Sequence, residues 1–158
     1  MGERTFDRVF IDSPCTGLGT LRRHADIRWR LRPETIAESA ELDARLLESA
    51  ASHVAPGGVL AYATCTVTHE ENADAVEAFL ATEAGAAFEV VPCRNPDLDI
   101  ELPFFSTVLE PGGPDAHFLA LLRRKPNSRF SFPDRANGKW KCDYLVSFSI
   151  PMECYFKK

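Results

Sequence analysis

Two of the five cysteines, Cys15 and Cys65, stand where a thiol could act chemically rather than only fill space. Cys15 ends the turn Asp12-Ser13-Pro14, which follows an apolar segment, and Cys65 directly follows the apolar run 59–64. A lone cysteine in a strand is usually a small buried hydrophobe. A deprotonated thiol at an accessible strand end is instead a nucleophile suited to covalent catalysis. Two such ends favour the catalytic interpretation.

The other three cysteines lack this placement, and we interpret them as structural: Cys93, Cys142 and Cys154. No pair of cysteines has the close spacing of a zinc or thioredoxin-type site, so the sequence predicts no metal site. Reduced thiols in a cytoplasmic chain are the simplest interpretation. No apolar run approaches the roughly 18 residues that a membrane helix needs, so we expect no membrane association.

Residue patterns predict the elements that position the two thiols. Residues 6–11 are rich in β-formers and predict a strand. Pro33 and Glu34 suit the first turn of a helix, and the segment 56–58 (Pro-Gly-Gly) ends it. The apolar positions of this helix recur every three or four residues and predict one buried stripe: Ile36, Ala40, Ala44, Leu47, Ala51 and Val54.

A second helix and further strands are predicted after Cys65. Thr68 and Glu71 have the spacing of a capping box, which predicts a helix start whose positive end would lower the pKa of Cys65. The predicted apolar face of this helix is Ala75, Val76, Phe79 and Leu80. The remaining predicted strands are residues 88–91, 104–109 and 117–122, the last two joined by a turn at 111–114.

Alternating strands and helices are typical of an α/β fold with a parallel sheet. We expect strands 6–11 and 59–64 to be parallel and adjacent, joined by a right-handed crossover. Ligands of open α/β sheets bind beyond the carboxyl ends of the strands. The pattern therefore predicts that Cys15 and Cys65 lie close together at the functional edge.

Charge is distributed unevenly along the chain, whose net charge is -5. Residues 1–32 hold seven arginines against four acidic residues, whereas residues 33–125 hold five basic residues against sixteen acidic ones. A basic block on an acidic body indicates a local anionic partner, although solvated surface charge is the default interpretation of any such cluster.

Longer stretches around both thiols resemble a known family. Residues 12–24, Asp-Ser-Pro-Cys-Thr-Gly-Leu-Gly-Thr-Leu-Arg-Arg-His, resemble motif IV of the Sun/RsmB-type RNA (cytosine-5) methyltransferases, and the match continues to Trp29. Residues 62–66, followed by Glu-Glu-Asn at 70–72, resemble their motif VI, and residues 105–124 resemble their closing β-hairpin. The resemblance implies a Rossmann-like, S-adenosylmethionine-dependent methyltransferase sheet, present from its fourth strand onward.

The resemblance also implies a covalent mechanism. The Cys65 thiolate would add to carbon 6 of cytosine, so that carbon 5 accepts the methyl group of S-adenosylmethionine. Cys15 would be needed to release the methylated base, and Asp12 would hold the cytosine edge. Asp12 and Pro14 would also border the cofactor. A DNA cytosine-5 methyltransferase would use Cys15 as its nucleophile instead, which the Arg22-Arg23-His24 continuation argues against.

The loop 21–32 is the predicted RNA contact. Arginines suit phosphate groups, and flat side chains can stack on unpaired bases. A role for Trp29 in packing the loop is the alternative. The candidate RNA-binding residues are Arg22, Arg23, His24, Arg28, Trp29 and Arg30, and ribosomal RNA is the expected partner.

The family's glycine-rich cofactor motif has no counterpart in this sequence. We therefore expect residues 1–125 to be the C-terminal half of a catalytic domain, and residues 126–158 to be a tail without assigned role, with a hairpin at 139–150. Strand 6–11 would then be an exposed edge, so that the isolated chain pairs with a missing N-terminal segment or with a second copy, or is marginally stable. The alternative to an active enzyme is a catalytically inactive RNA-binding or regulatory remnant.

Overall fold

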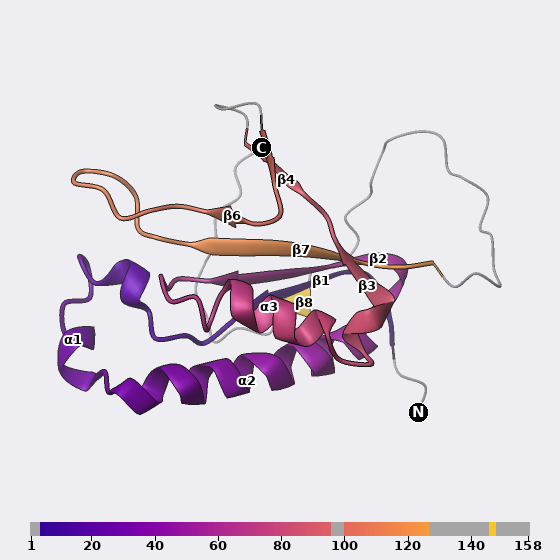
Figure 1. Ribbon diagram of the computed structural model, residues 1–158, viewed down its shortest axis with the longest axis horizontal. Helices are drawn as coiled ribbons and strands as arrows, with labels where there is room; N and C mark the ends of the chain where they lie inside the picture. The colour runs from indigo at the N-terminus through magenta and orange to yellow at the C-terminus, as the bar shows by residue number, and fades with distance from the viewer. Residues whose placement is uncertain (1–3, 96–99, 127–145, 148–158) are drawn as a thin grey trace.

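The computed structural model describes residues 4–95, 100–126 and 146–147. Within this part of the chain, one sheet has the strand order β3-β7-β2-β1-β8, and β6 pairs with β7. Two helices lie on one face of the sheet (Figure 1). The elements of this layer are β1 (Phe6–Asp12), α2 (Pro33–Ser52), β2 (Val54–Thr64), α3 (Ala73–Leu80), β3 (Phe88–Val90), β6 (Phe105–Ser106), β7 (Phe118–Arg124) and β8 (Val146–Ser147). The predicted α/β fold with a partial open sheet is confirmed.

The first two long strands, β1 and β2, are parallel and adjacent, as predicted. Asp12, the last residue of β1, lies opposite Ala63 of β2. The backbone N–H of Ser13 donates to the carbonyl of Ala63 at 2.9 Å, which continues the pairing one residue beyond β1. The chain segments that carry the two predicted catalytic cysteines therefore leave the sheet side by side.

Helix α2 covers β1 and β2 with its buried stripe. The stripe contains Leu47, Ala50 and Ala51, and also the fully buried Asp43, which the apolar pattern did not predict. The helix ends at Ser52, earlier than predicted, and Val54 already belongs to β2. The predicted stop at residues 56–58 was wrong, because Val54 pairs with Phe6 and the extra residues are absorbed as an irregularity of the β1–β2 register.

Helix α3 begins at Ala73 with Asn72 as its N-cap, so the predicted capping box of Thr68 and Glu71 was wrong. The chain between Cys65 and Asn72 is a loop, and Glu71 serves that loop instead. The predicted apolar face is confirmed: Ala75, Val76 and Phe79 are buried, and Leu80 is partly buried against the core. Phe79 contacts Phe88 of β3 at a ring-centroid distance of 5.6 Å, which joins α3 to the sheet edge.

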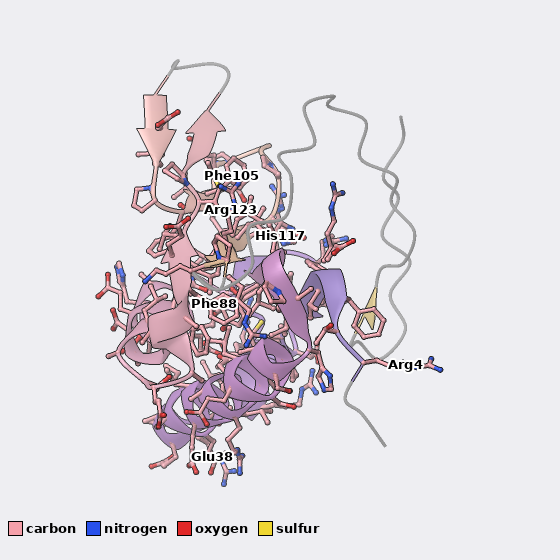
Figure 2. The ribbon with its side chains drawn as sticks, turned by 90° about the vertical axis from the view of Figure 1, so that its right-hand side faces the viewer. Arg4, Glu38, Phe88, Phe105, His117 and Arg123 are labelled. Atoms are coloured by element: carbon pink, nitrogen blue, oxygen red, sulfur yellow. The ribbon has the colours of Figure 1, made fainter. Side chains whose placement is uncertain are left out.

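The closing hairpin is confirmed with different bounds, since β6 and β7 pair antiparallel and β7 continues alongside β2. A second hairpin, β4 (Cys93–Asn95) with β5 (Ile100–Leu102), was not predicted and extends away from the helices. In Figure 2, Glu38 of α2 points away from the sheet on the opposite side of the molecule from this hairpin.

The edge of β1 is not fully open, contrary to the prediction of an exposed edge strand. Val146 and Ser147 of β8 pair in parallel with Val9 and Phe10. The rest of the predicted hairpin 139–150, like most of the tail 126–158, lies outside the described residues. No helix in the described part of the chain is long and apolar enough to span a membrane.

Candidate active site

The two predicted catalytic thiols meet beyond the carboxyl ends of β1 and β2. The sulfur atoms of Cys15 and Cys65 are 3.4 Å apart, within hydrogen-bond reach of each other. The backbone N–H of Cys65 also donates to the sulfur of Cys15, at 3.3 Å. Both side chains are only partly buried. The prediction that the topology brings the two cysteines together is therefore confirmed by the geometry.

The hydrogen bond between the two thiols makes them chemically unequal. It lowers the pKa of Cys65, against the opposing effects of burial and of the nearby Asp12 charge. The same hydrogen bond, together with burial, raises the pKa of Cys15. This asymmetry favours Cys65 as the thiol that ionises first and Cys15 as the proton donor of the pair. The source of the lowered pKa is Cys15, and not the helix terminus predicted at Thr68.

A buried carboxylate, Glu71, ties the two cysteine loops together. It is 0% exposed and accepts hydrogen bonds from the backbone N–H and the hydroxyl of Thr16, at 2.7 and 2.6 Å. The hydroxyls of Thr66 and Thr68 donate to it as well, at 3.2 and 2.5 Å. Since Thr16 follows Cys15 and Thr66 follows Cys65, this one side chain holds both thiols in register.

Asn72 and Tyr62 complete the support of the Cys65 loop. The Asn72 side chain accepts from the Thr64 hydroxyl at 2.5 Å and donates to the Thr66 carbonyl at 3.2 Å, so it spans Cys65 on both sides. The Tyr62 hydroxyl donates to the Glu71 carbonyl at 2.6 Å. These contacts pull the loop after Cys65 back onto β2.

Glycine is required at two positions of the Cys15 loop. Gly17 has φ +71°, a left-handed conformation that L side chains rarely adopt. Gly19 donates its N–H to the Cys65 carbonyl at 2.9 Å and accepts from the Ala116 N–H at 3.0 Å. A Cβ at Gly19 would lie 2.2 Å from the Ala116 carbonyl oxygen and 2.7 Å from that of Cys65. Only glycine therefore fits at position 19, between the backbone segments at Cys65 and Ala116.

Beneath the Cys15 loop lies a second buried carboxyl group, that of Asp43 on α2. The Ser13 hydroxyl donates a hydrogen bond to its Oδ1, while its Oδ2 is buried without a hydrogen-bond partner among the described residues. Burial raises the pKa of Asp43 to about 6, and the nearby Glu71 charge adds to that effect. The Ser13 hydrogen bond opposes it. The carboxyl group anchors the segment before Cys15 from below.

This raised pKa predicts a pH-dependent stability. A carboxyl group that binds its proton more tightly when folded contributes stability at low pH, and that contribution is lost as the pH rises from about 4 to about 6. Denaturation curves of the wild type and Asp43→Asn should therefore diverge over this range, the wild type losing up to about 3 kcal/mol relative to the variant. Parallel pH profiles for the two proteins would contradict this.

The remaining predicted catalytic and cofactor residues, Asp12 and Pro14, flank the thiol pair. Asp12 is partly buried at the end of β1 and close enough to raise the pKa of Cys65, and its carboxylate makes no hydrogen bond or ion pair with the described residues. Pro14 is exposed. Both residues thus present free surface beside the thiols, as groups that contact a ligand must.

The predicted RNA-binding residues fall into two groups. Arg22 and Arg23 lie after the short turn η1 (Leu18–Thr20) and form ion pairs with Asp115. The second group, called the α1 group, lies on or near α1 (Ile27–Arg30), a short helix with no buried residue. Its members are His24, Arg28, Trp29 and Arg30. There the Arg30 guanidinium pairs with Asp26 at 2.5 Å, and Trp29 is 84% exposed. This exposure argues against the packing role that was the alternative for Trp29.

His24 and Arg28 belong with the α1 group. Both side chains are exposed, and the Nε of Arg28 donates to the Ala25 carbonyl at 3.1 Å. The α1 group therefore presents cationic side chains and one free indole ring to solvent. Such a surface can contact phosphates and stack on a base.

Comparison with known proteins identifies a family that this chain matches. A family model described as 16S rRNA methyltransferase RsmB/F matches residues 1–124. The chain is similar to the ribosomal RNA small subunit methyltransferase B of Klebsiella pneumoniae, with 40% identity over 80% of this chain and 28% of the relative. It is 48% identical to the protein of the same name from Salmonella newport, over 54% of this chain and 20% of the relative.

A solved structure shares the fold. A methyltransferase homolog protein from Pyrococcus horikoshii superposes with a TM-score of 0.59 and 27% identity, over 77% of this chain and 40% of the other. Of the two bacterial relatives named above, in contrast, the chain spans only about a quarter of the length.

Proposed function

This chain belongs to the 16S rRNA methyltransferase RsmB/F family, and on that premise we propose that it carries the base-side chemistry of an RNA cytosine-5 methyltransferase. The observation that carries the proposal is the pair of thiols 3.4 Å apart beyond two parallel strands. The hydrogen bond between them lowers the pKa of Cys65. This is the arrangement that a covalent mechanism needs.

In the proposed mechanism, the Cys65 thiolate forms a bond from its sulfur to carbon 6 of the target cytosine. The cofactor, S-adenosylmethionine, supplies the methyl group that carbon 5 then accepts. Asp12 accepts a hydrogen bond from the cytosine amino group with its carboxylate and so orients the base. A water molecule then takes the proton from carbon 5 and the sulfur–carbon bond breaks, which restores the aromatic base and the Cys65 thiolate.

Cys15 is proposed to serve that last step. Its raised pKa keeps it protonated beside the sulfur of Cys65. A thiol in that position stabilises the departing thiolate by donating a hydrogen bond to it. Pro14, exposed next to Cys15, is proposed to border the cofactor together with Asp12.

RNA is the proposed substrate, and the exposed α1 group is its proposed contact outside the thiol pair. Ribosomal RNA is the substrate class of the family. The α1 group suits an unpaired strand because an exposed indole can stack on a base while arginines reach its phosphates. Arg22 and Arg23 remain proposed phosphate contacts through the exposed parts of their side chains.

Trp29→Ala is expected to weaken binding of single-stranded RNA by about 1–3 kcal/mol, because one base loses its stacking partner. Trp29→Phe should retain most of the affinity. Fluorescence anisotropy with a labelled RNA measures both effects. Leu102→Ala, which trims a partly exposed apolar side chain on the distant β5, is the matched control and should bind as the wild type does. Equal affinities of Trp29→Ala and Leu102→Ala would exclude the stacking role.

The alternative is that the chain is a catalytically inactive RNA-binding or regulatory remnant of such an enzyme. Isothermal titration calorimetry with S-adenosylmethionine distinguishes the two. Binding by the purified chain, with methyl transfer to 16S rRNA, supports the enzyme. RNA binding without cofactor binding supports the remnant.

We further propose that residues 1–125 act as the catalytic part and that the edge of β1 can pair with a further strand. Val9 and Phe10 are the only residues of β1 that pair with β8 in the described part of the chain. A strand that continues this pairing along β1 could come from a second copy or from another segment of the same protein. Analytical ultracentrifugation distinguishes a dimer from a monomer.

A further inference from the structure

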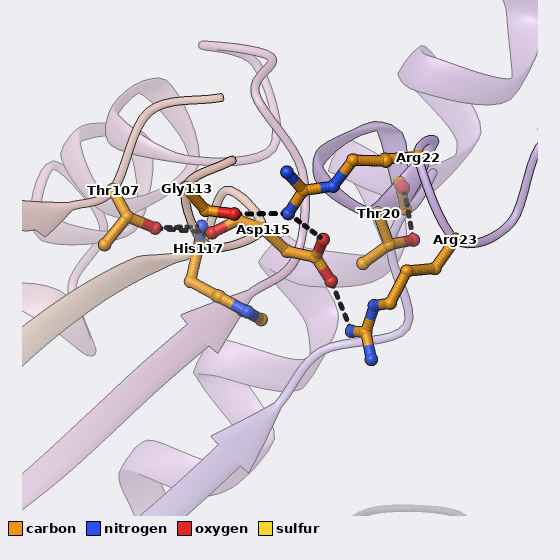
Figure 3. Close-up of polar contacts among 8 residues, drawn as sticks. Thr20, Arg22, Arg23, Thr107, Gly113, Asp115 and His117 are labelled. Atoms are coloured by element: carbon orange, nitrogen blue, oxygen red, sulfur yellow. Dashed lines mark hydrogen bonds and ion pairs between the residues drawn. The ribbon is translucent and has the colours of Figure 1, made fainter. Parts of the chain in front are cut away.

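A buried carboxylate in the loop between β6 and β7, that of Asp115, binds two arginines of the Cys15 loop. Asp115 is 7% exposed. Its two oxygens form ion pairs with Arg22, at 3.6 Å, and with Arg23 (Figure 3). Arg22 also donates to the Gly113 carbonyl in the same loop. Both guanidinium groups thus face the protein, although their side chains are about half exposed.

The loop that carries Asp115 is itself firmly closed. The Thr107 hydroxyl donates to the Asp115 carbonyl at 2.8 Å and accepts from the His117 N–H at 2.9 Å. The Thr107 N–H donates to the His117 carbonyl at 2.9 Å. Figure 3 shows these contacts on the side of Asp115 opposite the arginines. Asp115 is therefore fixed at its backbone and binds the arginines with its side chain.

Two backbone hydrogen bonds connect this loop to Cys65. Ala116, the neighbour of Asp115, donates to the Gly19 carbonyl at 3.0 Å, and Gly19 donates to the Cys65 carbonyl at 2.9 Å. The chain at Gly19 is held so tightly between the two that no Cβ fits there. Arg22 and Arg23 follow Gly19 by three and four residues. Their ion pairs with Asp115 and the hydrogen bonds of Gly19 therefore join the same two loops.

We propose that Asp115 is a positioning residue for Cys65, which it holds through Gly19 by binding Arg22 and Arg23. The inference rests on the proposed function, because it concerns the placement of that function's nucleophile. Loss of the Asp115 contacts frees Gly19, and with it the Cys65 carbonyl. The sulfur of Cys65 then leaves the Cys15 thiol for part of the time, and its thiolate loses the hydrogen bond that stabilises it.

Reactivity of the Cys65 thiol tests this inference in the full chain, without RNA or cofactor. Alkylation of Cys65 by iodoacetamide is followed at pH 7 and pH 10, with the modified residue located by peptide fragmentation in a mass spectrometer. The variants are Asp115→Asn and Arg23→Gln. Glu110→Gln makes the same carboxylate-to-amide change at an exposed site of the same loop. Cys93, on β4, is the internal reference.

In both test variants, alkylation of Cys65 at pH 7 is expected to slow by about threefold or more, because less thiolate is present. The rate at pH 10, and both rates of Cys93, should not change. Glu110→Gln should react as the wild type does. An unaltered ratio of the two Cys65 rates in a folded Arg23→Gln protein overturns the proposal, even if Asp115→Asn does not fold. Circular dichroism establishes folding.

The result is separable from the outcome for the proposed function. A chain that fails to methylate RNA can still show the expected change in thiol reactivity, which supports the positioning role alone. An active chain whose Cys65 reacts identically in all variants retains the proposed function and loses this inference. In an active chain, methyl transfer is a second test of the positioning role. Asp115→Asn should lower kcat with little change in KM for RNA.

Discussion

Cys65→Ala is expected to abolish methyl transfer to RNA, lowering the rate by about 10⁴-fold or more. Without the sulfur there is no bond to carbon 6, and carbon 5 of the cytosine is too weak a nucleophile to take the methyl group. Transfer of a radiolabelled methyl group from S-adenosylmethionine, in a catalytic domain that contains these residues, measures the effect.

Cys93→Ala is the matched control for this loss. Cys93 is also a partly buried free thiol, but it lies on β4, and burial raises its pKa. Its removal should leave the rate within about twofold of the wild type, because Cys93 lies on a different strand and outside the thiol pair. Comparable losses in the two variants would mean that thiol removal damages the fold and not the chemistry.

Glu71→Gln is expected to destabilise the protein by about 2–4 kcal/mol and to lower methyl transfer with it. The buried carboxylate accepts from one backbone N–H and three threonine hydroxyls. An amide of the same shape places its own N–H₂ group against some of these donors, which leaves buried donors unpaired. The loops of Cys15 and Cys65 are then no longer held together by Thr16 and Thr66.

The neighbouring Glu70 gives this prediction a matched control. Glu70→Gln makes the same substitution one residue earlier, on an exposed side chain. Urea denaturation should show the full loss of stability in Glu71→Gln and a change within about 0.5 kcal/mol in Glu70→Gln. If the two variants unfold alike, Glu71 does not hold the loops.

The convergence of Cys15 and Cys65 could be predicted because it depends on local patterns. An apolar run followed by a turn indicates where each strand ends, and parallel strands place their carboxyl ends at the same edge. In the structure, the register of these strands sets Asp12 opposite Ala63. The prediction needed only the order of the elements and no knowledge of side-chain packing.

The supports of the site could not be predicted in this way. Glu71 follows Thr68 at capping-box spacing, and the two do form a hydrogen bond, but the loop continues to Asn72 before a helix begins. What decided its role was Thr16, 55 residues earlier in the chain. Asp43 interrupts an apolar stripe, and no local pattern relates it to Ser13.

The arginines of the Cys15 loop show the same limit. Their composition predicts RNA contacts, and Arg22 and Arg23 have the exposure that such contacts require. Their ion pairs with Asp115 depend on a hairpin loop more than ninety residues further along the chain. A sequence pattern reports charge and spacing, whereas the partner of a charge is fixed only when distant loops pack together.

A covalent adduct between Cys65 and a cytosine of RNA tests the central claim most directly. The Cys15→Ala protein is incubated with 16S rRNA and S-adenosylmethionine and run on a denaturing gel. Because release of the base is proposed to need Cys15, an RNA-linked band should accumulate in this variant, although it forms more slowly because Cys65 lacks the hydrogen bond that lowers its pKa. It should be absent from Cys65→Ala and from the double variant. An adduct that forms without Cys65 would contradict the assignment of the nucleophile.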